Sequence, residues 1–143
     1  TGTPHSREAL ATLLWPESTS SRARASLRRV LVTLRQALGE TWLDVGPETV
    51  CLLPNEDLWL DAAACQDRLA ACQTHEHPLD QACADCVPRL AEAIELYRED
   101  FLPGFTLPDS PAFEEWALLQ REHFQRLAIE ALQRLALEGL NAS

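Results

Sequence analysis

Apolar residues recur at helical spacing in a segment of the chain that is otherwise rich in arginine. Five of them follow the i, i+3, i+4, i+7 pattern of a helix with one apolar face: Leu27, Val30, Leu31, Leu34 and Leu38. The serines of "ESTSS" before this stretch are good N-cap residues, and Gly39 after it suits a helix end. The pattern predicts an amphipathic helix over residues 20–38 whose apolar face lies in a core.

Two shorter elements are predicted on either side of this helix. "SREALATLLWP" indicates a short helix, because Ser6 is a plausible N-cap and Pro16 disfavours a helical residue before it. "WLDVGPETVCLLP" has two runs of aromatic and β-branched residues around the turn-like Gly46-Pro47-Glu48. It predicts a β-hairpin over residues 42–53.

The rest of the chain has a helical pattern. Helices are predicted over residues 61–72 and 88–100, and a longer one over residues 110–138, which Ser110 as N-cap and Pro111 at the first helical position introduce. The long helix carries one apolar stripe: Phe113, Trp116, Phe124, Leu127, Ala131 and Leu135. A helix with such a stripe must bury it against another helix or a partner.

Charge divides the chain into two parts. The formal net charge is −10, yet residues 1–50 hold six arginines against five acidic residues and are close to neutral. The remaining residues hold six arginines against 17 acidic residues. Because an acidic surface repels phosphate, any contact with nucleic acid is expected from the N-terminal part.

Five arginines lie on the predicted helix over residues 20–38, and a helical wheel places them away from its apolar face. Arg22 and Arg29 point almost opposite to that face, whereas Arg24, Arg28 and Arg35 form a flank. Guanidinium groups among small residues suit the DNA major groove, where arginine forks guanine O6 and N7. A solvated surface helix whose arginines pair with acids elsewhere is the alternative. The predicted order of elements is also that of a winged helix-turn-helix: a short helix, a serine-rich turn, an arginine helix and a hairpin.

Several segments, in the same order, resemble a known family. "SREALATLLWPES", "RASLRRVLVTLRQALG", "LWLDAAACQDRLA", "AIELYREDFLPGF" and "FEEWALLQREHFQRLAIEALQRLA" are similar to the bacterial transcriptional activator domain proteins, which include the Streptomyces antibiotic regulatory proteins. The resemblance covers nearly the whole chain. The sequence departs from the family where "YRED" has Glu99 in place of an expected glycine, and the hairpin tip "GPET" carries no arginine.

The resemblance implies a mainly α fold with two domains. Residues 1–56 would be the C-terminal part of a winged-helix DNA-binding domain, with the recognition helix at 20–38 and the wing at 42–53. Residues 57–143 would be a tetratricopeptide-repeat-like helical activator domain, and whether this domain is complete at its C-terminus is left open. Since the family has a small sheet and a further helix before "SREAL", we expect a fragment of a regulator that binds double-stranded promoter DNA and forms a homodimer or contacts another protein partner.

A second cluster of chemistry-bearing residues lies in "HEHPLDQACADC". His75, His77, Cys83 and Cys86 form an H-x-H-x5-C-x2-C pattern, and imidazole and thiolate are ligands that tetrahedral zinc prefers. Buried cysteines or a disulfide bond are alternatives to a structural zinc site. The sequence alone assigns no metal and no cofactor.

An enzyme is not expected, since the sequence contains no glycine-rich phosphate loop, zinc-protease helix motif or nucleophile elbow. No apolar run reaches the length that a bilayer demands and no secretory signal begins the chain, so we expect a cytoplasmic protein without a membrane partner. The alternative to a DNA-binding regulator is a non-enzymatic helical module that binds protein and has no DNA binding of its own.

Overall fold

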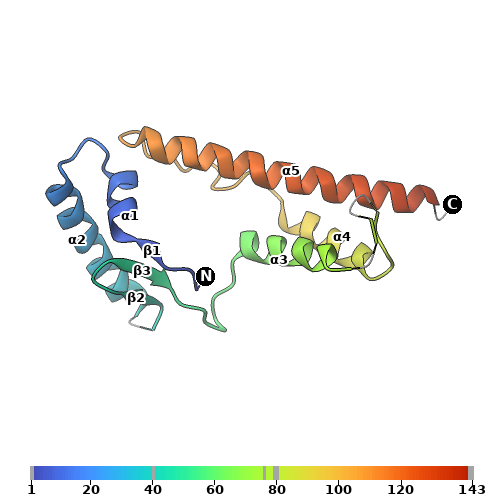
Figure 1. Cartoon of the computed structure of the whole chain (residues 1–143), viewed down its shortest axis with the longest axis horizontal. Coiled ribbons are helices and arrows are strands. Elements are labelled where there is room, and N and C mark those ends of the chain that lie inside the picture. Colours follow the sequence, from blue (N-terminus) through green and yellow to red (C-terminus); the bar gives the residue numbers. More distant parts are fainter. Residues whose placement is uncertain (1, 40, 76, 79–80, 142–143) are drawn as a thin grey trace. The chain divides into compact units, whose positions relative to one another are not determined.

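The computed structural model describes residues 2–39, 41–75, 77–78 and 81–141. In these ranges the chain is mainly helical, with five helices and a small three-stranded antiparallel sheet (Figure 1). Within the same ranges, none of the helices combines the length and the apolarity that crossing a bilayer requires.

The chain divides into two compact units. The first contains residues 1–58 and 106–116, and the second contains residues 59–105 and 117–143. Residues 106–116, which the sequence analysis assigned to the helical domain, thus belong to the first unit.

The first unit combines two helices with the sheet. Its elements are β1 (His5–Ser6), α1 (Arg7–Leu14), α2 (Ser20–Leu38), β2 (Leu43–Val45) and β3 (Thr49–Leu52). The strands are arranged in the order β1-β3-β2, with Asp44 opposite Cys51 and His5 opposite Val50. The predicted hairpin is confirmed as β2 and β3, whereas β1 was not predicted.

The start of α1 and the end of α2 lie where the sequence indicates. The Ser6 hydroxyl accepts a hydrogen bond from the Ala9 amide at 3.3 Å and caps α1. Gly39 ends α2 with a φ of +96°, in the left-handed region that glycine tolerates. At the sheet, Arg7 Nη1 donates to the Gly46 carbonyl at 2.8 Å, so the start of α1 is fastened to the hairpin turn.

The core of the first unit is smaller than the apolar pattern of α2 predicts. Its buried residues come from both helices and two strands: Ala11, Ala23, Leu27, Leu31, Leu43 and Val50. Val30, Leu34 and Leu38 were expected in the core, but they are 46%, 39% and 44% exposed. The prediction was wrong for these three, because α1 and the small sheet do not cover the whole apolar face of α2.

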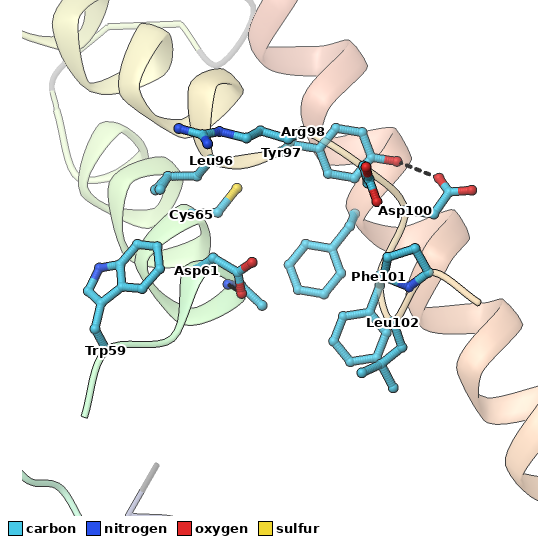
Figure 2. A pocket seen from close by; sticks show the side chains of 13 residues that line it. Trp59, Asp61, Cys65, Leu96, Tyr97, Arg98, Asp100, Phe101 and Leu102 are labelled. Atoms are coloured by element: carbon cyan, nitrogen blue, oxygen red, sulfur yellow. Dashed lines mark hydrogen bonds between the residues drawn. The ribbon is translucent and has the colours of Figure 1, made fainter. Parts of the chain in front are cut away.

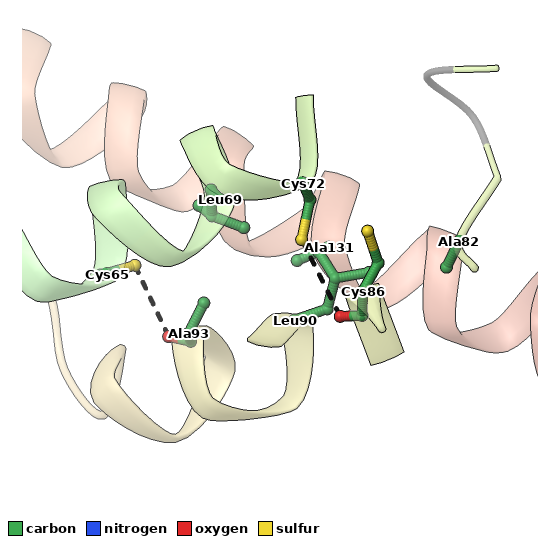
Figure 3. Close-up of a cluster of buried hydrophobic side chains, with 8 residues drawn as sticks. All are labelled: Cys65, Leu69, Cys72, Ala82, Cys86, Leu90, Ala93 and Ala131. Atoms are coloured by element: carbon green, nitrogen blue, oxygen red, sulfur yellow. Dashed lines mark hydrogen bonds between the residues drawn. The ribbon is translucent and has the colours of Figure 1, made fainter. Parts of the chain in front are cut away.

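The second unit is built from three helical segments, α3 (Asp61–Gln73), α4 (Cys86–Leu96) and the larger part of α5 (Pro111–Asn141). Figure 3 shows the cluster of buried side chains that they share: Cys65, Leu69, Cys72, Ala82, Cys86, Leu90, Ala93 and Ala131. Arg68 and Glu92 join α3 to α4 through an exposed ion pair at 2.6 Å. The helix predicted over 88–100 is shorter at its C-terminal end, because the Tyr97 amide caps it by bonding the Ala93 and Ile94 carbonyls.

Ser110 connects two segments of the first unit that are far apart in sequence. Its hydroxyl accepts a hydrogen bond from the Phe113 amide at 3.2 Å, which caps the start of α5, and it donates to the Leu13 carbonyl at the end of α1. Only 1% of the residue is exposed.

We expect Ser110→Ala to lower the free energy of unfolding by about 1–2 kcal/mol, because a partly buried carbonyl and a helix amide both lose their partner. Urea unfolding followed by far-UV circular dichroism measures the change. Ser18→Ala, at an exposed serine, is the control and should stay within about 0.5 kcal/mol. Equal effects of the two substitutions would contradict the role given to Ser110.

Candidate functional site

The arginines of α2 lie where the helical wheel predicts. Arg22, Arg24, Arg28 and Arg29 are exposed and Arg35 is half-buried, whereas Ala23, Leu27 and Leu31 face the core. Because the side chains of one face are buried, the opposite face of α2 presents its guanidinium groups to solvent. The exposed arginines of α2 therefore lie away from the core of the first unit.

The five arginines differ in their partners. Arg24 Nη2 lies 3.4 Å from the Glu8 carboxylate, so this arginine already pairs α2 with α1. Such an exposed pair contributes roughly 0–1 kcal/mol and can exchange Glu8 for another anion. Within the described part of the chain, the guanidinium groups of Arg22, Arg28 and Arg29 make no hydrogen bond and no ion pair. These three are the arginines most available to a partner.

The second unit brings together the histidine and cysteine side chains that the sequence singled out. His75, His77, Cys83 and Cys86 each offer one ligand atom, and these atoms all lie within 4.8 Å of one another. His75 and His77 follow the end of α3, whereas Cys83 precedes α4 and Cys86 begins it. All five cysteines of the chain are free thiols, so the disulfide alternative is absent from this structure.

The individual distances show how the four groups converge. His75 Nδ1 lies 3.2 Å from Cys83 Sγ and 3.3 Å from Cys86 Sγ, and His77 Nε2 lies 3.2 Å from Cys86 Sγ. Cys86 is fully buried, and the other three residues are half-buried. The cluster therefore sits at the edge of the hydrophobic core of the second unit.

The two thiols of the cluster have different acidities. The hydrogen bond with His75 lowers the pKa of Cys83 to about 6, despite an opposing contribution from burial. Burial raises the pKa of Cys86 to about 11, and its neighbour Cys72 adds to that increase. The cluster thus pairs a thiol that ionises readily, beside an imidazole, with a thiol that resists ionisation.

Arg89 is the functional neighbour that the sequence analysis missed. Its Nη1 lies 2.9 Å from His75 Nε2, and a guanidinium group can only donate, so Nε2 accepts and the ring proton is on Nδ1. The position three residues after Cys86 on α4 was the available signal, because it places both residues on one helix face.

A separate pocket of about 520 Å³ lies in the second unit, beside the start of α3 and the segment that follows α4 (Figure 2). Four aromatic side chains line it: Trp59, Tyr97, Phe101 and Phe124. Tyr97 donates a hydrogen bond to the Asp100 carboxylate at 3.1 Å, and Phe101 stacks on Phe124 with ring centroids 5.4 Å apart. The pocket is thus an aromatic recess that three acidic residues also line, Asp61, Glu99 and Asp100.

The thiol in this pocket is not suited to nucleophilic chemistry. Burial and the charge of Asp61 both raise the pKa of Cys65, and its Sγ–H donates to the Ala93 carbonyl at 3.5 Å. The thiolate is the nucleophilic form, so a raised pKa lowers the reactivity of this cysteine.

No family model, no curated protein and no solved structure matches the chain. The likeness to the bacterial transcriptional activator domain proteins is therefore a hypothesis that rests on the motifs quoted above.

Proposed function

We propose that the chain is part of a sequence-specific DNA-binding transcriptional regulator, in which α2 is the recognition helix and the β2–β3 hairpin is the wing. The observation that carries this proposal is the outward face of α2. There Arg22, Arg28 and Arg29 are exposed and have no partner within the described residues. The helical second unit then serves dimerisation or contact with another protein.

Physical chemistry supports a nucleic-acid partner for this face. With 19 residues, α2 is roughly 28 Å long, and the major groove of B-DNA admits a helix of this kind. Small residues such as Ala25 stand beside the arginines, so the backbone of α2 can approach the base edges closely. On the flank, Arg24, Arg28 and Arg35 would hold phosphates and fix the register.

Selection from a randomised duplex library, followed by fluorescence anisotropy across a salt series, tests the proposal in the intact protein. We expect enrichment of a defined motif, tighter binding to it than to its scrambled duplex, and a steep fall of affinity with salt. A failure to enrich any motif, together with salt-independent binding, would contradict sequence-specific recognition.

A second candidate function is a protein-binding module without DNA binding, and the surface of α5 favours it. In the part of α5 that belongs to the second unit, six large apolar side chains are exposed: Leu118, Leu119, Ile129, Leu132, Leu137 and Leu140. An apolar stripe of this size on a helix suits the matching face of a second copy of the chain.

Light scattering coupled to gel filtration measures the mass of the assembly. A dimer that Leu118→Glu and Leu132→Glu convert to a monomer would support this module. A strict monomer at every concentration would contradict a self-associating α5.

A further inference from the structure

We propose that His75, His77, Cys83 and Cys86 bind one structural zinc ion, which joins the segment after α3 to the start of α4. This inference is independent of the DNA-binding proposal, since all four residues belong to the second unit. The zinc proposal rests on the positions of these four side chains.

The four ligand atoms already have nearly the spacing of a zinc shell. Tetrahedral zinc, with Zn–S near 2.3 Å and Zn–N near 2.0 Å, holds its ligand atoms roughly 3.3–3.8 Å apart. The nitrogen–sulfur distances here are 3.2, 3.3 and 3.2 Å, and the largest separation in the set is no more than 4.8 Å. Small side-chain shifts therefore suffice to surround an ion.

Local turns present the ligands in two pairs. The amides of Cys86 and Val87 both donate to the Cys83 carbonyl, at 2.9 and 3.1 Å, and this turn brings the two thiols of C-x2-C to one side. The His77 amide donates to the His75 carbonyl at 2.9 Å, which tightens the H-x-H segment. Because the backbone makes both pairs without the metal, the ion has only to join them.

The hydrogen bonds of His77 prepare its ring for a metal. His77 Nδ1 lies 2.9 Å from the Pro78 carbonyl and must donate its proton there, which leaves the lone pair of Nε2 directed toward Cys86. Metal-bound histidines typically make this outer hydrogen bond to a carbonyl or carboxylate, because it fixes the tautomer.

His75 requires one rearrangement. When zinc binds Nδ1, the single ring proton moves through solvent from Nδ1 to Nε2, so the ring stays neutral. Nε2 then no longer accepts from Arg89, so the guanidinium group must turn away. Asp85 and Glu92 line the same surface recess as Arg89 and offer it carboxylates.

The donor set decides the metal and its role. Two thiolates with two imidazoles favour zinc over magnesium or calcium, which prefer oxygen ligands. Four protein ligands fill a tetrahedral shell and leave no open position for substrate, which is typical of a structural site. Cys86 also contributes to the buried core, so the ion would brace the core at the edge where α4 begins.

Metal analysis of the purified, reduced protein tests the proposal. In non-chelating buffer we expect one zinc per chain, and replacement by Co²⁺ should give the visible absorption of tetrahedral coordination with thiolate-to-cobalt charge transfer. Chelation of the zinc should lower the melting temperature and expose Cys83 and Cys86 to alkylation. Mass spectrometry confirms that the thiols remain reduced.

Variants distinguish residues that bind zinc from residues that only support the fold. Cys83→Ser and His77→Ala are expected to weaken zinc binding by about 100-fold or more, whereas Cys65→Ser and His123→Ala, outside the cluster, keep one zinc per chain. Zinc well below one per chain in reduced protein overturns the proposal. So does an equal loss of zinc in the Cys65→Ser control.

Discussion

Replacing Arg22, Arg28 and Arg29 together with alanine is expected to weaken binding of the intact protein to its selected DNA motif by about 100-fold or more. Each lost phosphate contact makes the negative slope of log K against log salt shallower by about 0.9. Each lost base contact costs about 1–3 kcal/mol of binding free energy. The slope of log K against log salt should therefore become shallower by up to about 3. Fluorescence anisotropy at several salt concentrations measures both quantities.

A matched control is needed, because three arginines contribute to net charge as well as to contacts. Arg68, Arg98 and Arg126 are exposed on the acidic second unit, and their joint replacement removes the same charge. Because the proposal assigns DNA contact to α2, this control should leave affinity and slope nearly unchanged at physiological salt. Alanine favours helix, and circular dichroism should show intact folding in both variants. Unchanged affinity and slope in the α2 variant would remove the basis of the DNA-binding proposal.

The elements of this chain could be predicted where local signals suffice. The helix predicted over residues 20–38 is α2 with the same limits, because a spaced apolar face and Gly39 are both local features. Ser110 and Pro111 likewise locate the start of α5. The two-residue strand β1 could not be predicted, because its existence depends on pairing with β3, which lies far along the chain.

Burial was harder to predict than secondary structure. Periodicity shows which face of α2 is apolar, but not how much of that face other elements cover. Leu31 is buried whereas Leu34, one turn further on, is 39% exposed. Coverage depends on the lengths of α1 and of the strands, which are tertiary properties.

The two candidate sites differ in how far the sequence could define them. The exposed arginines of α2 follow from the helical wheel, although the pairing of Arg24 with Glu8 does not. For the histidine and cysteine cluster, the C-x2-C spacing predicts only that two thiols can share a turn. The meeting of His75 and His77 with them depends on how the segment between α3 and α4 folds back, and only the structure shows that.

Leu90→Ala is expected to lower the free energy of unfolding of the second unit by about 2–5 kcal/mol. Leu90 is 0% exposed and lies at the centre of the cluster that α3, α4 and α5 share, so its truncation leaves a cavity as well as losing buried apolar area (Figure 3). Amide hydrogen exchange within α4, combined with urea unfolding, reports on this unit separately from the first.

Leu119→Ala is the matched control, because it makes the same change in a helix at a side chain that is 56% exposed. The helix propensities of the two substitutions cancel, and we expect the control to stay within about 0.5 kcal/mol. Leu90 lies one helical turn after Cys86, so a cavity there should also loosen the thiol at the start of α4. Added zinc should therefore stabilise the Leu90→Ala protein no more than the natural chain, because a loosened site binds the ion more weakly. Equal destabilisation by Leu90→Ala and Leu119→Ala would instead mean that the α3–α4–α5 cluster is not the core of the unit.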